Sequence, residues 1–215
     1  MKKASAYRGF SLVELLVTMA IAAILGAITL TAIGAARAHG DRVQAIANMR
    51  KIGSGIGYHA ADKDGLLPGP LWPGQVAELD PNRSGRLVRE LAPYLDIETP
   101  ATPKVIDLFV PPAYRKKTEP ASLATARTYV MNMAISENAA TLNPWGSLAA
   151  ADGSGPARLA SIPAGAWGFS DADRLHPRVA GASWAANTPA KPIHGKRLAW
   201  FFNGSVGQVD EADLQ

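Results

Sequence analysis

One long apolar stretch dominates the pattern of hydrophobic and polar positions, from Phe10 to Ala36. Glu14 is the only ionisable side chain in it, and the other polar residues are small. The 27 residues of this stretch exceed the roughly 20 that a helix needs to cross a bilayer. Because they are apolar on all sides and not along one stripe, they predict a membrane-spanning helix and not the core helix of a soluble enzyme.

The residues before the apolar stretch predict its orientation. Lys2, Lys3 and Arg8 precede it, and no acid comes before Glu14. A basic flank stays cytoplasmic, so we expect the rest of the chain to lie outside. A cleaved secretory signal has a shorter apolar core and ends in a small-residue cleavage site. This stretch is therefore predicted to be an anchor that stays on the protein.

The helical pattern continues beyond the membrane on one face. Apolar residues recur at spacings of three and four, at Val43, Ile46, Met49, Ile52 and Ile56. The pattern stops at the segment 62–65, Asp-Lys-Asp-Gly, which is typical of a helix terminus. This segment also resembles a fragment of a calcium loop, but the remaining ligands of such a loop are absent. A single helix is therefore predicted from about residue 11 to about residue 61.

The rest of the chain predicts an α+β head with a small antiparallel sheet. Residues 66–86 contain four prolines and are expected to be irregular, and residues 138–160 are expected to form a loop of small residues. A short helix is predicted at 85–94. Strands are predicted at 127–135, 166–170, 197–202 and 205–209, the last two joined by Asn203-Gly204, with Leu198, Trp200 and Phe202 on one face.

Composition narrows the class of protein. Lys and Arg number 22 and Asp and Glu 18, but three of the basic residues lie in the first nine, which leaves 19 against 18 and no nucleic-acid footprint. Cysteine is absent, so neither disulfides nor thiol chemistry is available. The motifs G-x-S-x-G, G-x-x-x-x-G-K-[ST] and H-E-x-x-H are also absent. We therefore expect no enzyme.

The residues GFSLVELLV, Gly9 to Val17, resemble the prepilin processing motif of type IV pilins and type II secretion pseudopilins. The resemblance implies that prepilin peptidase cuts between Gly9 and Phe10 and methylates Phe10. It also implies that Glu14 pairs with the terminal amine of a neighbouring subunit during filament assembly. The chain departs from many pilins because no proline lies between Phe10 and Pro68.

The implied role of Glu14 agrees with its physical chemistry. A cut after Gly9 creates a cation at Phe10, close to the depth of the Glu14 carboxylate. Two opposite charges removed from water attract strongly, and each offsets part of the other's desolvation. The alternative is that Glu14 lies at the level of the headgroups and is solvated.

The head resembles prepilin-like proteins with a C-terminal H-X9-DG signature. The segments LAPYL, DLFVPPA, TYVMNMAI and GAWGFSDADR match in order, and HGKRLAWFFNGSVGQV, His194 to Val209, matches the signature itself. Eight residues separate His194 from Asn203, and Asn stands in place of Asp.

A metal site in the head stays open as a second interpretation. Asp171, Asp173, His176 and His194 carry ligand types that suit several metals, and the major pseudopilins of type II secretion bind calcium in a C-terminal loop. No fixed spacing supports a site here, so Asp171 and Asp173 are expected to make turn and backbone bonds. We expect no cofactor, with calcium as the exception. Four tryptophans are expected in the core or at an interface, namely Trp145, Trp167, Trp184 and Trp200.

These observations predict four parts: a leader at 1–9, a transmembrane segment at 10–36, an extramembrane continuation of the helix at 37–65 and a pilin-like head at 66–215. The expected protein is a structural subunit of a type IV pilus-like filament or a secretion pseudopilus. Its expected partners are prepilin peptidase, other pilin or pseudopilin subunits and the bacterial inner membrane. The head is expected in the periplasm or on a surface filament. The alternative is a membrane-anchored binding protein that does not polymerise.

Overall fold

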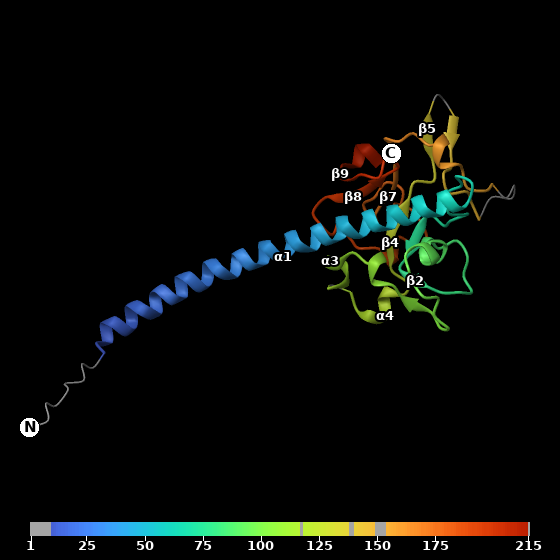
Figure 1. The fold of residues 1–215 in the computed structure, drawn as a ribbon. Helices are drawn as coiled ribbons and strands as arrows, with labels where there is room; N and C mark the ends of the chain where they lie inside the picture. The colour runs from blue at the N-terminus through green and yellow to red at the C-terminus, as the bar shows by residue number, and fades with distance from the viewer. Residues whose placement is uncertain (1–9, 117, 138–139, 149–153, 215) are drawn as a thin grey trace, which may run out of the picture. The chain divides into compact units, whose positions relative to one another are not determined.

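The computed structural model describes residues 10–116, 118–137, 140–148 and 154–214. The chain divides into two compact units, Met1–Gly40 and Asp41–Gln215, and helix α1, Leu12–Asp62, has residues in both (Figure 1). The predicted helix from about residue 11 to about residue 61 is confirmed. The α+β class, with a long N-terminal helix and an antiparallel sheet, is confirmed as well.

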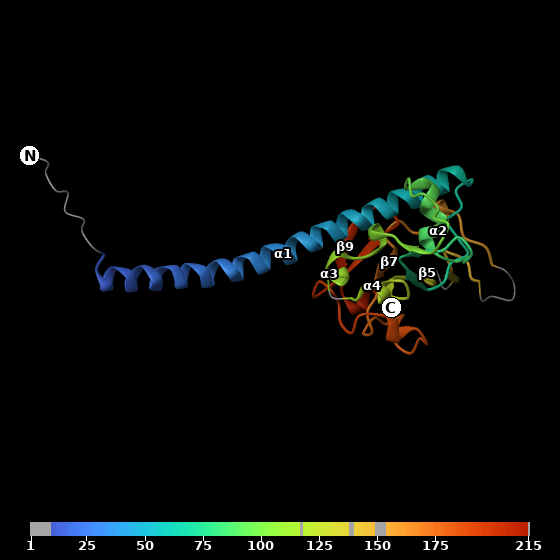
Figure 2. The same cartoon turned by 90° about the horizontal axis from the view of Figure 1, so that it is seen from below.

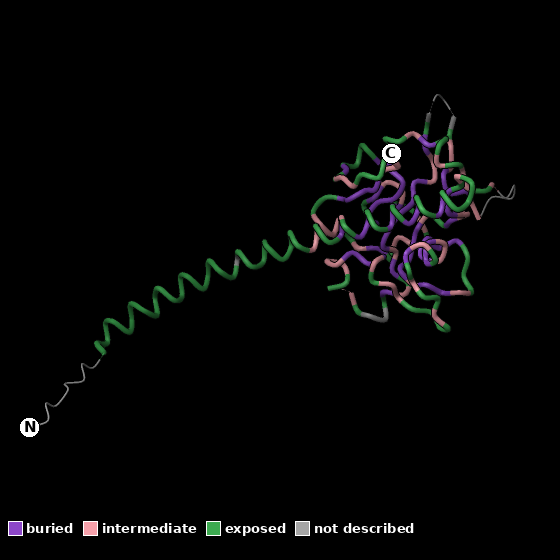
Figure 3. The backbone as a smooth tube through the Cα atoms, in the orientation of Figure 1, coloured by how far each residue is buried: buried purple, intermediate pink, exposed green. Residues whose placement is uncertain are grey.

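From Leu12 onward the described residues of the first unit are helical. Every side chain described between Phe10 and Gly40 is exposed (Figure 3). The hydroxyls of Thr18 and Thr29 donate to carbonyl oxygens of the preceding turn, at 2.8 and 2.7 Å. Within the described residues, α1 is the one helix long and apolar enough to cross a membrane. Apolar side chains and internally bonded polar groups are what a bilayer requires.

Helix α1 ends at the predicted segment. Asp64 and Gly65 adopt left-handed backbone conformations, with φ of 51° and 82°. The Gly65 N–H donates to the carbonyl of Ala60 at 2.8 Å, a bond that closes the last helical turn. The Tyr94 hydroxyl donates to the Asp62 carboxylate at 2.7 Å. The helix-terminus interpretation of this segment is therefore confirmed.

The head is built on a five-stranded antiparallel sheet in the order β1-β4-β7-β8-β9 (Figures 1 and 2). The strands are β1 Gly74–Val76, β4 Arg127–Met131, β7 Trp167–Asp171, β8 Arg197–Phe201 and β9 Val206–Val209. Two small two-stranded sheets accompany it, formed by β2 Glu78–Leu79 with β3 Lys104–Val105, and by β5 Ile135–Glu137 with β6 Ala140–Leu142.

The other helices of the head are short. The α-helices are α2 Leu87–Leu91, α3 Pro112–Arg115 and α4 Pro120–Leu123. The 3-10 helices are η1 Ala92–Tyr94, η2 Asp107–Phe109, η3 Leu159–Ser161, η4 Ala185–Asn187 and η5 Glu211–Leu214. The short helix predicted at 85–94 is present as α2 followed directly by η1.

The main core of the head lies between the second half of α1 and one face of the sheet. From the helix it contains Ala45, Met49, Ile52 and Ile56, and from the sheet Tyr129, Met131, Phe169, Leu198 and Trp200. Burying one large apolar side chain contributes roughly 1.5–3 kcal/mol. The predicted helix face is correct from Ile46 onward, but Val43 is 52% exposed.

The hairpin predicted around Asn203-Gly204 is confirmed. β8 pairs with β9 antiparallel, and Leu198, Trp200 and Phe202 all pack toward the main core. The turn is one residue longer than Asn-Gly hairpins usually have. Gly204 has a φ of 83°, and its N–H donates to the Phe201 carbonyl at 2.8 Å. This pattern is typical of a three-residue loop that ends in a left-handed glycine.

The strand predicted over residues 127–135 is interrupted. β4 ends at Met131 and β5 begins at Ile135. Asn132 lies between them, and its side-chain oxygen accepts the Ala134 N–H at 3.3 Å while its amide donates to the Trp167 carbonyl at 3.0 Å. An asparagine that bonds its own backbone two residues onward favours a turn over a continuing strand.

Two expected irregular regions contain strands. Residues 66–86 include β1 and β2, and residues 138–160 include β6. These strands are only two or three residues long and carry too little alternation to be seen in the sequence. Residues 138–139 and 149–153 of the second region lie outside the described residues.

Candidate functional site

The start of α1 carries the residues that the sequence singles out for processing. Gly9 lies outside the described residues, and Phe10 is 79% exposed. Neither Phe10 nor Ser11 is helical, and the helix begins at Leu12. Two residues that are not helical, Phe10 and Ser11, therefore separate the predicted cut from the first residue of the helix.

Ser11 and Glu14 cap this end of the helix reciprocally. The Val13 N–H donates to the Ser11 hydroxyl oxygen at 3.3 Å. The Ser11 N–H donates to the Glu14 carboxylate at 2.9 Å. This arrangement is a capping box, and it satisfies two of the N–H groups that a helix start leaves without partners.

The cap gives Glu14 a local role that the sequence analysis missed. A negative charge at a helix N-terminus is stabilised by the helix dipole. One oxygen of Glu14 accepts the Ser11 N–H, and a carboxylate has capacity for several further bonds. The cap therefore leaves Glu14 able to accept from another donor. The signal was present in the sequence as Ser-x-x-Glu directly before an apolar run.

The predicted metal ligands of the head have protein partners. Asp173 accepts two bonds from the Arg197 guanidinium, at 2.6 and 2.9 Å, and both side chains are buried. Asp173 also accepts the Leu175 N–H at 2.9 Å, and Asp171 accepts the Leu198 N–H at 3.1 Å. The predicted turn and backbone bonds of the two aspartates are confirmed. The ion pair with Arg197 was not predicted.

His176 and Asp171 are buried, and the pKa of each is shifted in the direction that favours its uncharged form. The Nδ1 atom of His176 accepts the Arg178 N–H at 3.0 Å, so the proton lies on Nε2, 2.9 Å from the Ser170 hydroxyl. Burial, with the nearby Arg197, lowers the pKa of His176 to about 4. Burial also raises the pKa of Asp171 to about 7. Both shifts follow from the cost of charging a group out of water.

His194 does not belong to a group of possible metal ligands among the described residues. It forms an isolated bridge with Lys196 in the turn before β8. In the described part of the chain, no three His, Asp or Glu side chains are grouped as ligands for a metal ion. Asp171, Asp173 and His194 therefore gain no structural support as metal ligands, and calcium binding stays an untested prediction.

Comparison with known proteins identifies the N-terminal segment. A family described as a prokaryotic N-terminal methylation motif matches residues 4–35. No curated protein and no solved structure matches the chain. The match includes Gly9, Phe10 and Glu14 but none of the head. The resemblance of the head to H-X9-DG proteins stays a prediction.

Proposed function

We propose that this chain, which carries a prepilin-type N-terminal methylation motif, is a structural subunit of a pilus-like filament or of a secretion pseudopilus. The observation that supports the proposal most is the motif at residues 4–35, which precedes a single long apolar helix. In this proposal α1 holds the precursor in the bacterial inner membrane, and the head lies on the far side, in the periplasm or on the filament.

Processing is the first step of the proposed function. Prepilin peptidase cuts between Gly9 and Phe10 and methylates the new amine of Phe10. Mass spectrometry of protein extracted from membranes tests this step. The expected N-terminal peptide starts with methylated Phe10, and Gly9→Val leaves the precursor uncut. An intact Met1 start in the wild type, or a cut beyond Ala36, overturns the proposed processing.

Assembly is the second step, and the geometry of the cap supports it. After the cut, the Phe10 amine is a cation, and Glu14 of another subunit is an acid with free acceptor capacity. Pairing the two in the membrane offsets the desolvation of both charges. Small residues on α1 allow neighbouring helices to approach closely, among them Ala20, Ala23, Gly26 and Ala27.

Two substitutions of Glu14 separate capping from charge pairing. Glu14→Gln keeps a side chain that caps with Ser11, because glutamine also completes a capping box. It removes the charge that the amine of the neighbour needs. Glu14→Ala removes both. Truncating one partner of a buried ion pair costs about 3–5 kcal/mol, which matters at each subunit addition.

The measurement is the yield of sheared filaments and of multimers cross-linked through the transmembrane helices in cells. We expect both Glu14 variants to be inserted and cut but to assemble poorly. Glu98→Gln, a matched change at an exposed residue of the head, is the control and assembles normally. Normal assembly of Glu14→Gln together with failure of Glu14→Ala assigns Glu14 to the cap alone. Normal assembly of both removes the assembly role.

The second candidate is a membrane-anchored binding protein that never polymerises. It shares the anchor and the processing but needs a ligand site on the head. The absence of cross-links between helices of the wild-type protein in cells, with processing intact, favours this candidate. Neither candidate requires catalysis, so we propose that the protein is not an enzyme.

A further inference from the structure

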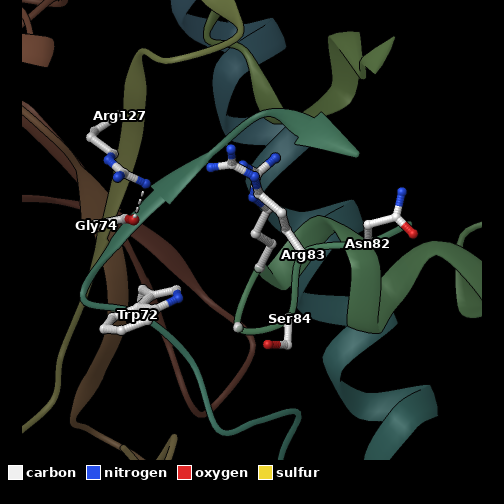
Figure 4. A pocket seen from close by; sticks show the side chains of 8 residues that line it. Trp72, Gly74, Asn82, Arg83, Ser84 and Arg127 are labelled. Atoms are coloured by element: carbon white, nitrogen blue, oxygen red, sulfur yellow. Dashed lines mark hydrogen bonds between the residues drawn. The ribbon is translucent and has the colours of Figure 1, made fainter. Parts of the chain in front are cut away.

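We propose that the head binds a singly charged acidic sugar, such as a uronic acid or a sulfated sugar, in a cavity at the outer edge of strand β1. The cavity has a volume of about 530 Å³, within the range of small-molecule sites. Its lining residues are Trp72, Gly74, Asn82, Arg83, Ser84, Gly85, Arg86 and Arg127 (Figure 4).

Three segments that are distant in sequence build the cavity. Trp72 and Gly74 come from the chain that enters β1, residues 82–86 from the loop between β2 and α2, and Arg127 from the start of β4. Figure 4 shows Arg127 beside Gly74 and Arg83 reaching up from the loop, with Trp72 at the lower end of the strand. Guanidinium groups and an aromatic ring therefore face a common space.

The buried side chain of Gln75 fixes the walls of the cavity. Its amide donates to the carbonyls of Trp72 and Gly85, and its oxygen accepts the Leu87 N–H at 2.6 Å. The backbone N–H of Trp72 also donates to the Gly85 carbonyl, at 3.0 Å. Gly85 has a φ of 75°, and a side chain there would meet the Trp72 ring. The backbone that carries the indole and the loop that faces it are thus held in place before a ligand arrives, which reduces the ordering cost of binding.

Among the described residues, one of the three cations of the cavity has no counterion. Arg86 pairs with Glu78 at 2.7 Å and Arg83 with Asp80 at 3.3 Å. Arg127 donates through Nη1 to the Gly74 carbonyl at 3.0 Å, and it has no carboxylate partner among the described residues. Three arginines against two acids give a local charge of +1.

Arg127 is the residue with the most to gain from an anion. It is partly buried, and its Nε has no hydrogen-bond partner in the described part of the protein. Burial and the nearby guanidiniums of Arg86 and Arg83 lower the pKa of Arg127. An oxyanion in the cavity relieves this repulsion and accepts charge-assisted bonds from the guanidinium.

The size of the charge and the presence of the indole select the ligand. A local charge of +1 matches a carboxylate or a sulfate ester, whereas a phosphate monoester carries about −1.5 to −2 at neutral pH. Trp72 is 45% exposed, and its ring offers a flat apolar surface to the C–H face of a sugar. The exposed side chains of Asn82 and Ser84 supply donors and acceptors for hydroxyl groups.

The test is isothermal titration of the full chain in detergent micelles. The probes are a trisaccharide with a single galacturonic acid residue and two neutral galactose residues, the matched neutral galactose trisaccharide, inorganic sulfate and adenosine monophosphate. We expect the acidic trisaccharide to bind and the neutral one not to bind. Binding weakens as salt is added, because the anion is held by charge.

Three variants locate the binding. Arg127→Gln is expected to weaken the acidic trisaccharide by about tenfold or more, because a bond to a charged group is lost. Trp72→Ala weakens the trisaccharide but leaves inorganic sulfate unchanged. Arg50→Gln, the same change at an exposed residue of α1 outside the cavity, has no effect. If Arg127→Gln melts below the temperature of the titration, Arg83→Gln replaces it, since the Arg83 side chain is 70% exposed.

Several outcomes overturn the proposal. Absence of binding by the acidic trisaccharide removes the site, and equal binding by Arg127→Gln and the wild type removes it from this cavity. Binding of sulfate or of the nucleotide as tightly as the trisaccharide, with no effect of Trp72→Ala, makes it a general anion site. The proposal does not rest on polymerisation, so a failure to assemble leaves it standing.

Discussion

Helix α1 contains two stretches, residues 12–40 and 41–62, whose side chains and glycines have different surroundings. Between residues 12 and 40 its described side chains are exposed, and an added Cβ at Gly26 or Gly34 meets nothing within 4 Å. Between residues 41 and 62 one face is buried, and an added Cβ at Gly53 overlaps the indole of Trp200. Glycine in the first stretch leaves space for whatever surrounds the helix. In the second stretch, Gly53 lets the helix pack directly against Trp200 of the head.

Polar groups differ in the same way. In the first stretch the hydroxyls of Thr18 and Thr29 bond within their own helix. In the head some buried polar groups bond between distant segments, as Asp173, two residues after β7, does with Arg197 of β8. The interior of a membrane offers no water, so the polar groups of a spanning helix have to form hydrogen bonds within the helix. A folded head can instead pair polar groups that are distant in sequence.

The largest expected effect on stability is at Trp200, the aromatic residue that packs against Gly53 of α1. Trp200 is 4% exposed and stacks on Phe169 with ring centroids 5.5 Å apart. Trp200→Ala is expected to reduce the free energy of unfolding of the head by about 3–5 kcal/mol, because it leaves a large cavity between α1 and the sheet. Thermal melting of the full chain in detergent measures it. An unchanged midpoint means that the ring does not support the head.

The next effect tests the two kinds of glycine against each other. Gly53→Ala is expected to cost about 1–3 kcal/mol, because α1 has to move away from Trp200. Gly34→Ala is the matched control, and it has space around it. The control should not lower the melting midpoint of the head, since alanine is the better helix former. Equal effects of the two changes contradict the comparison.

A third prediction concerns the two buried titratable groups and pH. The folded pKa of Asp171 is raised to about 7, so stability from this group is lost as the pH rises from 3.8 toward 7. The folded pKa of His176 is lowered to about 4, so stability is lost as the pH falls from 6.5 toward 4. Over the shared range the two effects oppose each other.

Single substitutions expose each effect. Asp171→Asn leaves the histidine alone, and its unfolding free energy is expected to fall by roughly 1–2 kcal/mol between pH 6.5 and about pH 5. His176→Gln leaves the aspartate alone and is expected to lose stability in the opposite direction, as the pH rises. Chemical denaturation at the two pH values measures both. A pH slope of the same sign in the two variants contradicts the assignment.

The smallest effect is at the start of the first stretch. Ser11→Ala removes one half of the capping box and is expected to destabilise the first turn of α1 by about 1 kcal/mol. Faster amide hydrogen exchange at residues 12–14 is the measurement. Exchange in the head should stay as in the wild type, because the cap lies in the other compact unit.

The sequence predicted those elements that carry a long or strong local signal. A mostly apolar stretch of 27 residues predicts the span, the period of three and four predicts the buried face of α1, and Asn-Gly predicts the hairpin. The break at Asn132 was missed, because a turn formed by one side chain competes with a run of strand-forming residues.

The candidate sites likewise differ in how far apart their residues lie in the sequence. The processing motif lies in consecutive residues, so the sequence shows it directly. The partner of Asp173 is Arg197, 24 positions later, and the arginine cavity combines residues 72 to 127. Such groups meet only through the order of strands, and no local spacing carries that information. The sequence analysis also gave no role to Trp72, because the other residues that line its cavity, up to Arg127, are distant in sequence.

The capping box at Ser11 and Glu14 has a consequence for the way the leader is able to vary. Both of its residues follow Phe10, so the proposed removal of residues 1–9 would leave every atom of the cap on the chain. Under the proposed processing, the bonds that start the helix would be the same before and after the cut. The two capping bonds therefore place no requirement on the length or the charge of the residues before Phe10.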